Sequence, residues 1–387
     1  MRKYQETHPW ITFQLDMRKA TPRLWMALGE AQSKCEHIAG VPLRPITANE
    51  LHKVFLAKGV LATTAIEGNT LSEKEVLEHL EGKLELPPSK EYLAQEITNI
   101  VAACNRIRDR MIKGEPSDLT VTMIKEFNQL VLEKLSMDAG VIPGELRQHS
   151  VTVARYRGAP AEDCEYLLEN MCQWLNAQFQ SSHRERIVYG ILKAVMAHLY
   201  LAWIHPFGDG NGRTARLIEF QVLLEAGVPT PAVHLLSNHY NQTRREYYVQ
   251  LDRASKSGGD PLPFIEYAVQ GFVDGLKSQL ELIRDQQLEV AWENYIHEEF
   301  HDMDSRANVR RRHLVLDLSL QKNPVGWPEI RQISPRMAEA YANKTSRTII
   351  RDLNFLMEMG LVKVGSKGWM ANKELMLAFL PARRMDD

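Results

Sequence analysis

A long apolar helix that stops at a proline most constrains the fold of this chain. From about Arg186 to Trp203 the residues are apolar on most of the helical circumference, which is typical of a helix surrounded by other helices. Pro206 ends this helix, because the residue before a proline, here His205, is pushed out of the helical region. The pattern predicts an all-α domain in which His205 has a fixed place at the end of a central helix.

Helical patterns also fill most of the remaining chain. Ser72 and Glu75 form a capping box that opens a helix running to about Glu81. Residues 148–156 depart from this rule, since apolar and polar residues alternate there and predict a short hairpin or flap. The other predicted helices cover about 48–66, 91–112, 120–135, 163–179, 212–226 and 261–287.

A change of charge marks the C-terminal part of the chain. Residues 305–387 hold 15 lysines and arginines and 8 acidic residues, a balance of +7, whereas the whole chain carries −2. We therefore expect an N-terminal helical region over 1–90, a helical core over 91–300 and a separate domain over 305–387.

Composition excludes several classes of protein. With 44% hydrophobic and 25% charged residues the chain resembles an ordinary soluble globular protein. A net charge of −2 predicts no chain-wide attraction to nucleic acid or membrane, and no apolar run of eighteen residues predicts a membrane span. The N-terminus lacks the apolar core of a signal peptide, and the four cysteines show neither metal-binding nor disulfide spacing. A cytoplasmic location is the default expectation.

The turn after the central helix predicts an anion site. Gly208, Gly210 and Gly212 allow close backbone approach, and their N–H groups precede a helix N-terminus, which favours negative charge. The side-chain amide of Asn211 can fix the turn. An ordinary glycine-rich connection between two helices is the alternative.

Charged residues in this turn specify the anion further. Arg213 and Arg216 lie three residues apart on one helix face, an arrangement that suits a polyphosphate between two guanidinium groups. Asp209 would be repelled by bare phosphate, so it predicts a bridging Mg²⁺. His205, with an ordinary pKa near about 6.5, is the natural proton acceptor.

Familiar phosphate and metal loops do not fit this turn. A Walker A loop needs a lysine where Arg213 stands, and an EF-hand would need a ligand at Arg213 and a glycine at Thr214. A dinucleotide fingerprint follows a strand, whereas a helix precedes this turn.

Residues 205–216, HPFGDGNGRTAR, match the signature of the Fic (filamentation induced by cAMP) family at every fixed position. The resemblance covers about residues 45–290. It implies an all-α Fic core and, in most members, transfer of AMP from ATP to a hydroxyl side chain of a target protein.

The resemblance also implies roles for individual residues. His205 would deprotonate the target Ser, Thr or Tyr hydroxyl, which attacks the α-phosphorus and expels pyrophosphate. Asp209 would hold Mg²⁺, while Arg213 and Arg216 would bind the β- and γ-phosphates. The nucleotide-binding residues that it implies are Gly210, Asn211, Gly212, Arg213, Thr214, Ala215, Arg216, Tyr247 and Tyr248.

Two further segments resemble parts of Fic proteins around the nucleotide. The flap of the family holds its target in an extended pose, and residues 148–156 lie where it is expected, with an ordinary connector as the alternative. Tyr247 and Tyr248 resemble a tyrosine pair near the base; one is expected against adenosine and the other against the core. The predicted flap residues are Val153, Ala154, Arg155 and Tyr156.

A short segment before the core resembles an inhibitory motif of the family. Residues 63–68 match the pattern Ser/Thr-x-x-x-Glu-Gly/Asn. We expect the carboxylate of Glu67 to form a bidentate pair with Arg216 and to occupy the place of the γ-phosphate, so that ATP binds only in an unreactive pose. An ordinary helix C-cap at Glu67 and Gly68 is the alternative.

The C-terminal segment resembles a small winged helix-turn-helix domain. Helical patterns over 309–320, 327–333 and 346–356 are followed by strand-like runs over 361–364 and 369–371. Arg347 and Arg351 are expected on the exposed face of the third helix, where either DNA binding or protein docking would suit them.

Together these features predict an autoinhibited protein adenylyltransferase that uses ATP and Mg²⁺ and modifies a target protein and itself. Two alternatives stay open: a Fic enzyme that removes AMP or uses another nucleotide, and a nucleotide-sensing regulator that binds DNA through 305–387. A homodimer is also left open.

Overall fold

The computed structural model describes residues 2–153, 156–180 and 184–377, and helices account for most of them. The chain forms two compact units, Met1–Leu280 and Glu281–Asp387, each described by itself below. The helices that begin in the first unit are α1 Tyr4–Thr7, α2 Pro22–Gly40, α3 Pro45–Ala65, α4 Glu73–Leu80, α5 Glu91–Ile112, α6 Val121–Val131, α7 Cys164–Gln178, α8 Arg186–Ile204, α9 Asn211–Glu225, α10 Leu235–Gln242, α11 Arg244–Lys256 and α12 Leu262–Glu299.

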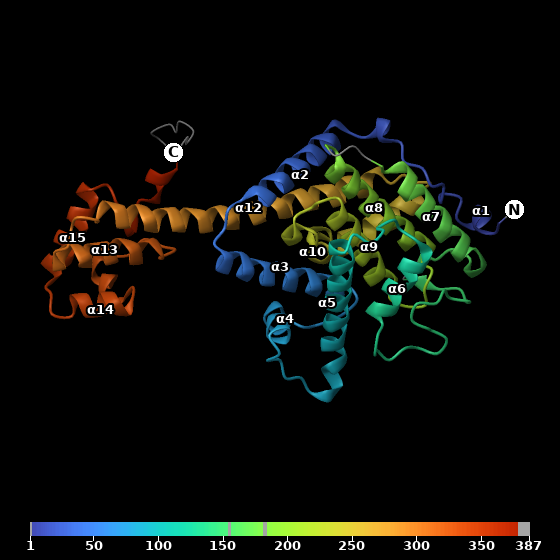
Figure 1. The fold of residues 1–387 in the computed structure, drawn as a ribbon, viewed down its shortest axis with the longest axis horizontal. Coiled ribbons are helices and arrows are strands. Elements are labelled where there is room, and N and C mark those ends of the chain that lie inside the picture. The colour runs from blue at the N-terminus through green and yellow to red at the C-terminus, as the bar shows by residue number, and fades with distance from the viewer. Residues whose placement is uncertain (1, 154–155, 181–183, 378–387) are drawn as a thin grey trace. The chain divides into compact units, whose positions relative to one another are not determined.

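Helices α8 and α9 form the centre of the first unit (Figure 1). They pack against each other, α7 and α2 cover α8, and α5 and α6 cover α9. By length and apolar composition alone α8 passes for a membrane span, but 78% of its most apolar window is buried within the structure. Helix α8 is therefore a core helix. The predicted all-α architecture is confirmed.

The turn between α3 and α4 carries Glu67 to the centre of this unit. Gly68 adopts a φ of 108°, which favours glycine, and ends α3 as predicted. The capping box is also present, since Ser72 N–H donates to Glu75 Oε2 at 2.7 Å and Glu75 N–H donates to Ser72 Oγ at 3.3 Å. The two caps fix both ends of the turn and leave Glu67 between them.

Helix α2 is not among the predicted helices, although the sequence carries a start signal for it. Thr21 accepts a hydrogen bond from the N–H of Leu24 at 3.1 Å, and Pro22 occupies the first helical position. The predicted hairpin is present as β1 Thr152–Val153 and β2 Tyr156–Arg157, an antiparallel pair that aligns Thr152 with Arg157. Two predicted flap residues, Ala154 and Arg155, lie outside the described residues.

The second unit has its own core of buried apolar side chains. The buried Asp352 links three helices of this unit. Its carboxylate accepts hydrogen bonds from Arg310 Nε, Arg311 Nε and the Tyr341 hydroxyl at 2.8, 2.9 and 3.1 Å. Besides the end of α12, its elements are α13 Arg306–Ser319, α14 Pro335–Tyr341, α15 Ser346–Glu358, β3 Val362–Gly365 and β4 Gly368–Ala371.

The second unit follows the predicted order of helices and a hairpin, with one difference. A 3₁₀ helix, Trp327–Gln332, stands where the second helix was predicted, and α14 follows it because Ser334 caps its start. The winged helix-turn-helix assignment stays a prediction. The boundary expected at residues 300–308 also stays a prediction, since α12 runs across the division between the units.

Candidate active site

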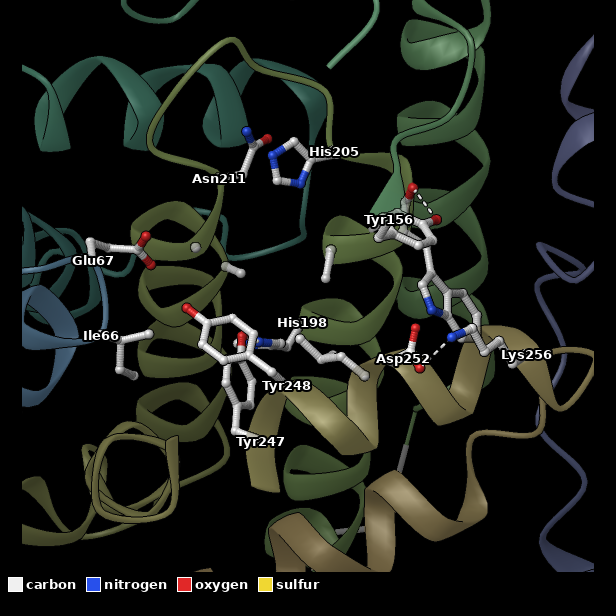
Figure 2. A pocket seen from close by; sticks show the side chains of 15 residues that line it. Ile66, Glu67, Tyr156, His198, His205, Asn211, Tyr247, Tyr248, Asp252 and Lys256 are labelled. Atoms are coloured by element: carbon white, nitrogen blue, oxygen red, sulfur yellow. Dashed lines mark hydrogen bonds and ion pairs between the residues drawn. The ribbon is translucent and has the colours of Figure 1, made fainter. Parts of the chain in front are cut away.

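His205 ends α8 in a left-handed backbone conformation, with φ 50° and ψ 59°. A residue with a side chain adopts this conformation at a cost of about 1–2 kcal/mol. The N–H of His205 donates to the Leu201 carbonyl at 2.8 Å, while its own carbonyl accepts from Arg147 Nε at 2.7 Å. The imidazole lines a cavity, as Figure 2 shows.

The surroundings of His205 keep its ring uncharged. Burial, followed by the positive charge of Arg147, lowers the pKa of His205 to about 4, although Glu67 and Asp209 act in the opposite direction. At pH 7 the imidazole is therefore neutral and able to accept a proton.

The turn after His205 is closed by the side chain of Asn211, as predicted. Its Oδ1 accepts from the Phe207 N–H at 3.0 Å, and its Nδ2 donates to the Phe207 carbonyl at 2.9 Å. Gly210 has a φ of 75°, and a Cβ there would come within 2.9 Å of Asn128 Nδ2. The turn therefore needs glycine at this position and ends at the N-terminus of α9.

Glu67 contacts Arg216, as the inhibitory motif predicted. Glu67 Oε1 lies 2.5 Å from Arg216 Nη2, and Arg216 Nη2 also donates to the Thr63 carbonyl at 2.8 Å. Although burial opposes it, Arg216 lowers the pKa of Glu67, and Glu67 in turn raises the pKa of Arg216. A Cβ at Gly212 would overlap Glu67 Oε1, so glycine at this position permits the contact.

The predicted bidentate geometry of this pair is wrong. In the described structure only Nη2 of Arg216 donates to Glu67, and the same nitrogen also donates to the Thr63 carbonyl. Within the described residues the buried Nε and Nη1 of Arg216 have no hydrogen-bond partner. A buried donor left without a partner costs about 1–3 kcal/mol, so this guanidinium retains capacity for an anion.

Arg213 is held by a different carboxylate that the sequence analysis missed. Its Nη1 donates to Glu96 Oε1 at 2.9 Å, and its Nη2 lies 3.3 Å from Asp209 Oδ1. Asn69, two residues after Glu67, donates to Glu96 Oε2 at 2.8 Å. The turn that carries Glu67 is thus linked through Glu96 to the first arginine of the motif.

A cavity of about 500 Å³, a size that suits a nucleotide, is lined by Glu67, His205 and Gly212. Arg213, Arg216, Asp209 and Gly210 do not line it. Glu67, His205 and Asn211 lie toward one end, and Asp252 and Lys256 lie toward the other (Figure 2). The predicted residues Asn211, Ala215, Tyr156, Tyr247 and Tyr248 also line it.

The two tyrosines both line the cavity but differ in exposure, and contact of either with adenosine stays a prediction. Tyr247 is buried and its hydroxyl lies 2.8 Å from His198 Nε2, whereas Tyr248 is 43% exposed. His198 Nδ1 in turn lies 3.1 Å from the buried Glu219. Burial raises the pKa of Tyr247, so its hydroxyl stays protonated. His198, which hydrogen-bonds with this hydroxyl, is not among the predicted site residues.

Thr214 and the flap residues have different places in the site. Thr214 is fully buried, its hydroxyl lies 3.3 Å from Asn128 Nδ2, and it does not line the cavity, so its nucleotide-binding role stays a prediction. Tyr156, on strand β2, donates its hydroxyl to the Trp203 carbonyl at 2.7 Å (Figure 2). The backbone of Val153 pairs with Tyr156 across the hairpin.

Asp209 offers a half-exposed carboxylate beside Arg213. Among the described residues, no group of three or more His, Cys, Asp or Glu is arranged to hold a metal. Mg²⁺ usually keeps several waters and binds through one or two carboxylates plus substrate phosphates. The donor set therefore fits an ion that arrives with a nucleotide and does not fit a cage made by protein alone.

Part of the chain that holds this site is similar to known proteins of one family. Residues 118–223 match the model of the Fic/DOC family. The chain is 29% identical over 231 residues to protein adenylyltransferase fic-1 of Caenorhabditis elegans, covering 58% of this chain and 42% of the relative. It is 27% identical over 244 residues to protein adenylyltransferase Fic of Nematostella vectensis, covering 63% and 53%. The alignments thus span about half the length of these relatives.

Solved structures share the fold. A Fic family protein from Desulfovibrio desulfuricans superposes with a TM-score of 0.56 at 18% identity, over 90% of this chain and 93% of that chain. Part of Fic-1 from C. elegans gives 0.55 at 24% identity, over 67% and 73%.

Proposed function

We propose, from the premise that this chain carries a Fic domain of the Fic/DOC family, that it is an autoinhibited protein adenylyltransferase. The observation that carries the proposal is the neutral imidazole of His205 on a nucleotide-sized cavity that Asn211 and Gly212, at the N-terminus of α9, also line. Beside it, Arg216 presents buried donors for which the described residues offer no partner. A proton acceptor next to an anion site is what transfer of a nucleotide to a hydroxyl requires.

ATP fits this cavity in one direction. Its phosphates belong at the N-terminus of α9, where Asn211 and Gly212 line the cavity and the helix dipole favours anions. Its adenosine belongs beside Tyr247 and Tyr248, whose aromatic rings offer apolar contact area.

The reaction needs one proton transfer and one displacement. His205 takes the proton of a Ser, Thr or Tyr hydroxyl on the target, the oxygen bonds to the α-phosphorus, and the bond to the β-phosphate oxygen breaks. Pyrophosphate leaves, and AMP stays on the target. Positioning and charge neutralisation by Arg213 and Arg216 lower the barrier, as in phosphoryl transfer generally.

Asp209 would hold the Mg²⁺ that accompanies ATP, since its carboxylate is half-exposed beside Arg213. The ion would neutralise phosphate charge.

The resting state is inhibited because Glu67 occupies Arg216. Its carboxylate lies where a phosphate oxygen would pair with the same guanidinium, and both groups are charged at pH 7. ATP can displace Glu67 or bind in a pose without that contact, and only the first alternative aligns the α-phosphorus with His205.

Labelled ATP tests the proposed reaction. With Mg²⁺, the Glu67→Gly chain is expected to become labelled by ATP carrying the label at the α-phosphorus and to stay unlabelled when the label is at the γ-phosphorus. Mass spectrometry of the product should show added AMP on a hydroxyl residue. Labelling from the γ-position would indicate phosphoryl transfer, and labelling from neither position would refute nucleotide transfer by this chain.

Duplex DNA binding by the second unit is a second candidate function, favoured by one observation. Arg347 and Arg351 are exposed on α15 and, together with Arg311, line a hollow of about 420 Å³. Basic side chains on an exposed helix suit contacts to phosphates and base edges.

We expect Arg347→Ala with Arg351→Ala to weaken duplex binding about tenfold and to reduce the salt slope by about 1 to 2. Fluorescence anisotropy over a salt series measures both quantities. Arg306→Ala with Lys322→Ala is the matched control, since both are exposed in the same unit and remove the same charge. Equal affinity of the two double variants, without salt dependence, would argue against DNA binding.

A further inference from the structure

One buried arginine, Arg147, connects the root of the flap with the catalytic turn. It is 3% exposed, and its guanidinium donates only to backbone carbonyls in the described structure. Nε donates to His205 at 2.7 Å and Nη1 donates to His149 at 2.6 Å. Nη2 donates to Ala159, with Ile204 at 3.4 Å.

The acceptors belong to two segments that must keep a fixed relation. His149 and Ala159 flank the hairpin β1–β2 on either side, whereas Ile204 and His205 end α8. Two backbone hydrogen bonds run beside the guanidinium, from the Arg147 N–H to Pro206 at 3.0 Å and from the Ala159 N–H to Ile204 at 3.2 Å. Arg147 therefore lies where the flap is attached to the turn that carries the base.

The end of α8 depends on such a donor. The last carbonyls of a helix have no partner within the helix, and a buried carbonyl left unpaired costs about 1–3 kcal/mol. His205 adds the strain of its left-handed conformation. By donating to the His205 carbonyl, Arg147 favours the backbone conformation that points the imidazole into the cavity.

The second root of the flap also lies directly against the base. A Cβ at Gly158 would come within 2.8 Å of the His205 Cβ and 3.0 Å of Arg147 Nη2. A shift of the flap root would therefore move against His205 itself, and the guanidinium fills the remaining space between them.

The charge of Arg147 has no acidic partner at ion-pair distance within the described residues, and burial lowers its pKa. A buried cation is costly unless it is paired or fully hydrogen-bonded. Neutral carbonyls satisfy its donors but leave its positive charge to act on His205, where it opposes protonation. A neutral side chain could supply hydrogen bonds but not this effect.

We propose that Arg147 is a positioning residue of the transfer reaction, which fixes His205 and the flap in one geometry through its hydrogen bonds to the carbonyls of both segments. This inference rests on the proposed function, because it assigns Arg147 to AMP transfer. In the proposed reaction Arg147 does not contact ATP and acts through His205 and the flap.

Two substitutions separate the hydrogen bonds from the charge. Arg147→Lys keeps the charge, but one ammonium group cannot replace three nitrogens that donate to four carbonyls, whereas Arg147→Met removes both the charge and the hydrogen bonds. In the Glu67→Gly background, Arg147→Lys is expected to lower the self-labelling rate at saturating ATP at least tenfold and to leave the dissociation constant of ATP within twofold. Arg186→Lys is the matched control, because Arg186 Nε donates to the Ala226 carbonyl at 2.9 Å from the start of α8.

The pH profile distinguishes positioning from general loss of structure. The charged groups that act on His205 are Arg147, Glu67 and Asp209, and Glu67 is absent from this background. Loss of positive charge raises the pKa of His205, so in Arg147→Met the fall of activity at acid pH is expected to begin at higher pH. In Arg147→Lys it should stay near that of the background.

Each outcome decides one point. Self-labelling by Arg147→Lys within twofold of the background, with an unchanged pH profile in Arg147→Met, would overturn the positioning role. If Arg147→Met does not fold, a rate in Arg147→Lys within twofold of the background overturns the role by itself. A joint loss of ATP binding and of thermal stability in Arg147→Lys would indicate a structural role only. Absence of labelling in the Glu67→Gly background itself would refute the proposed function, and with it this inference, whereas a labelled background with a fast Arg147→Lys chain would refute the inference alone.

Discussion

Glu67→Gly is expected to raise the rate at which the chain labels itself from α-labelled ATP by about ten- to hundredfold. The Glu67 carboxylate lies 2.5 Å from Arg216 Nη2. Hydrogen bonds between charged groups contribute about 1.5–3 kcal/mol, and 1.4 kcal/mol corresponds to about a factor of ten. Glycine leaves Arg216 free for the outermost phosphate, so a larger fraction of bound ATP reaches the reactive pose. Initial rates at saturating ATP and Mg²⁺ measure the effect.

Two further variants identify the carboxylate as the cause. Glu67→Gln keeps the shape of the side chain but loses its charge, so its rate should lie between those of the parent and Glu67→Gly. Glu81→Gly removes an acidic residue at the end of α4, where Glu81 pairs with Lys83 on the surface, and it should not change the rate. Equal labelling of the parent and Glu67→Gly would remove the inhibitory role from Glu67.

The parts of the site that could be predicted from sequence lie close together along the chain. The turn from His205 to Arg216 places a helix end, a glycine turn and a helix start within twelve residues, so its local geometry follows from the residues themselves. The structure accordingly places His205, Asn211 and Gly212 on one cavity. The capping box at Ser72 was predictable for the same reason.

The supporting residues could not be predicted, because each acts across a long stretch of chain. Asn128, Arg147 and Glu96 are separated from their partners Asp209, His205 and Arg213 by 81, 58 and 117 residues. None of the three stands in a motif or a distinctive spacing. Their roles depend on how the helices pack, which periodicity alone does not determine.

The geometry of the inhibitory contact shows the same limit at atomic scale. The short motif at residues 63–68 correctly paired Glu67 with Arg216. It could not show that the Thr63 carbonyl, a member of the same motif, would accept a hydrogen bond from the same Nη2. Glu67 accepts from one nitrogen of Arg216, although charge and shape alone favour a bidentate pair in which two nitrogens donate.

The stronger test of the chemistry is His205→Ala, which is expected to lower AMP transfer by at least about 10²-fold, the usual contribution of a general base. Alanine cannot take the hydroxyl proton, and no other described imidazole lies beside the phosphate end of the cavity, since His198 is bonded to Tyr247 deeper in the fold. The loss is measured in the Glu67→Gly background, where the expected higher rate of self-labelling leaves room for a decrease of this size.

Binding of ATP should survive this substitution, because Arg213, Arg216 and the start of α9 stay in place. An unchanged dissociation constant with a lost rate therefore assigns His205 to the chemical step, by the rule that an interaction made only in the transition state affects rate and not ground-state binding. His79→Ala is the control, since His79 lies on α4, where its ring hydrogen-bonds with Thr98. Retention of more than a tenth of the rate with ATP binding intact would mean that another group, or solvent, removes the proton, and the neutral imidazole at this helix end would then need a different explanation.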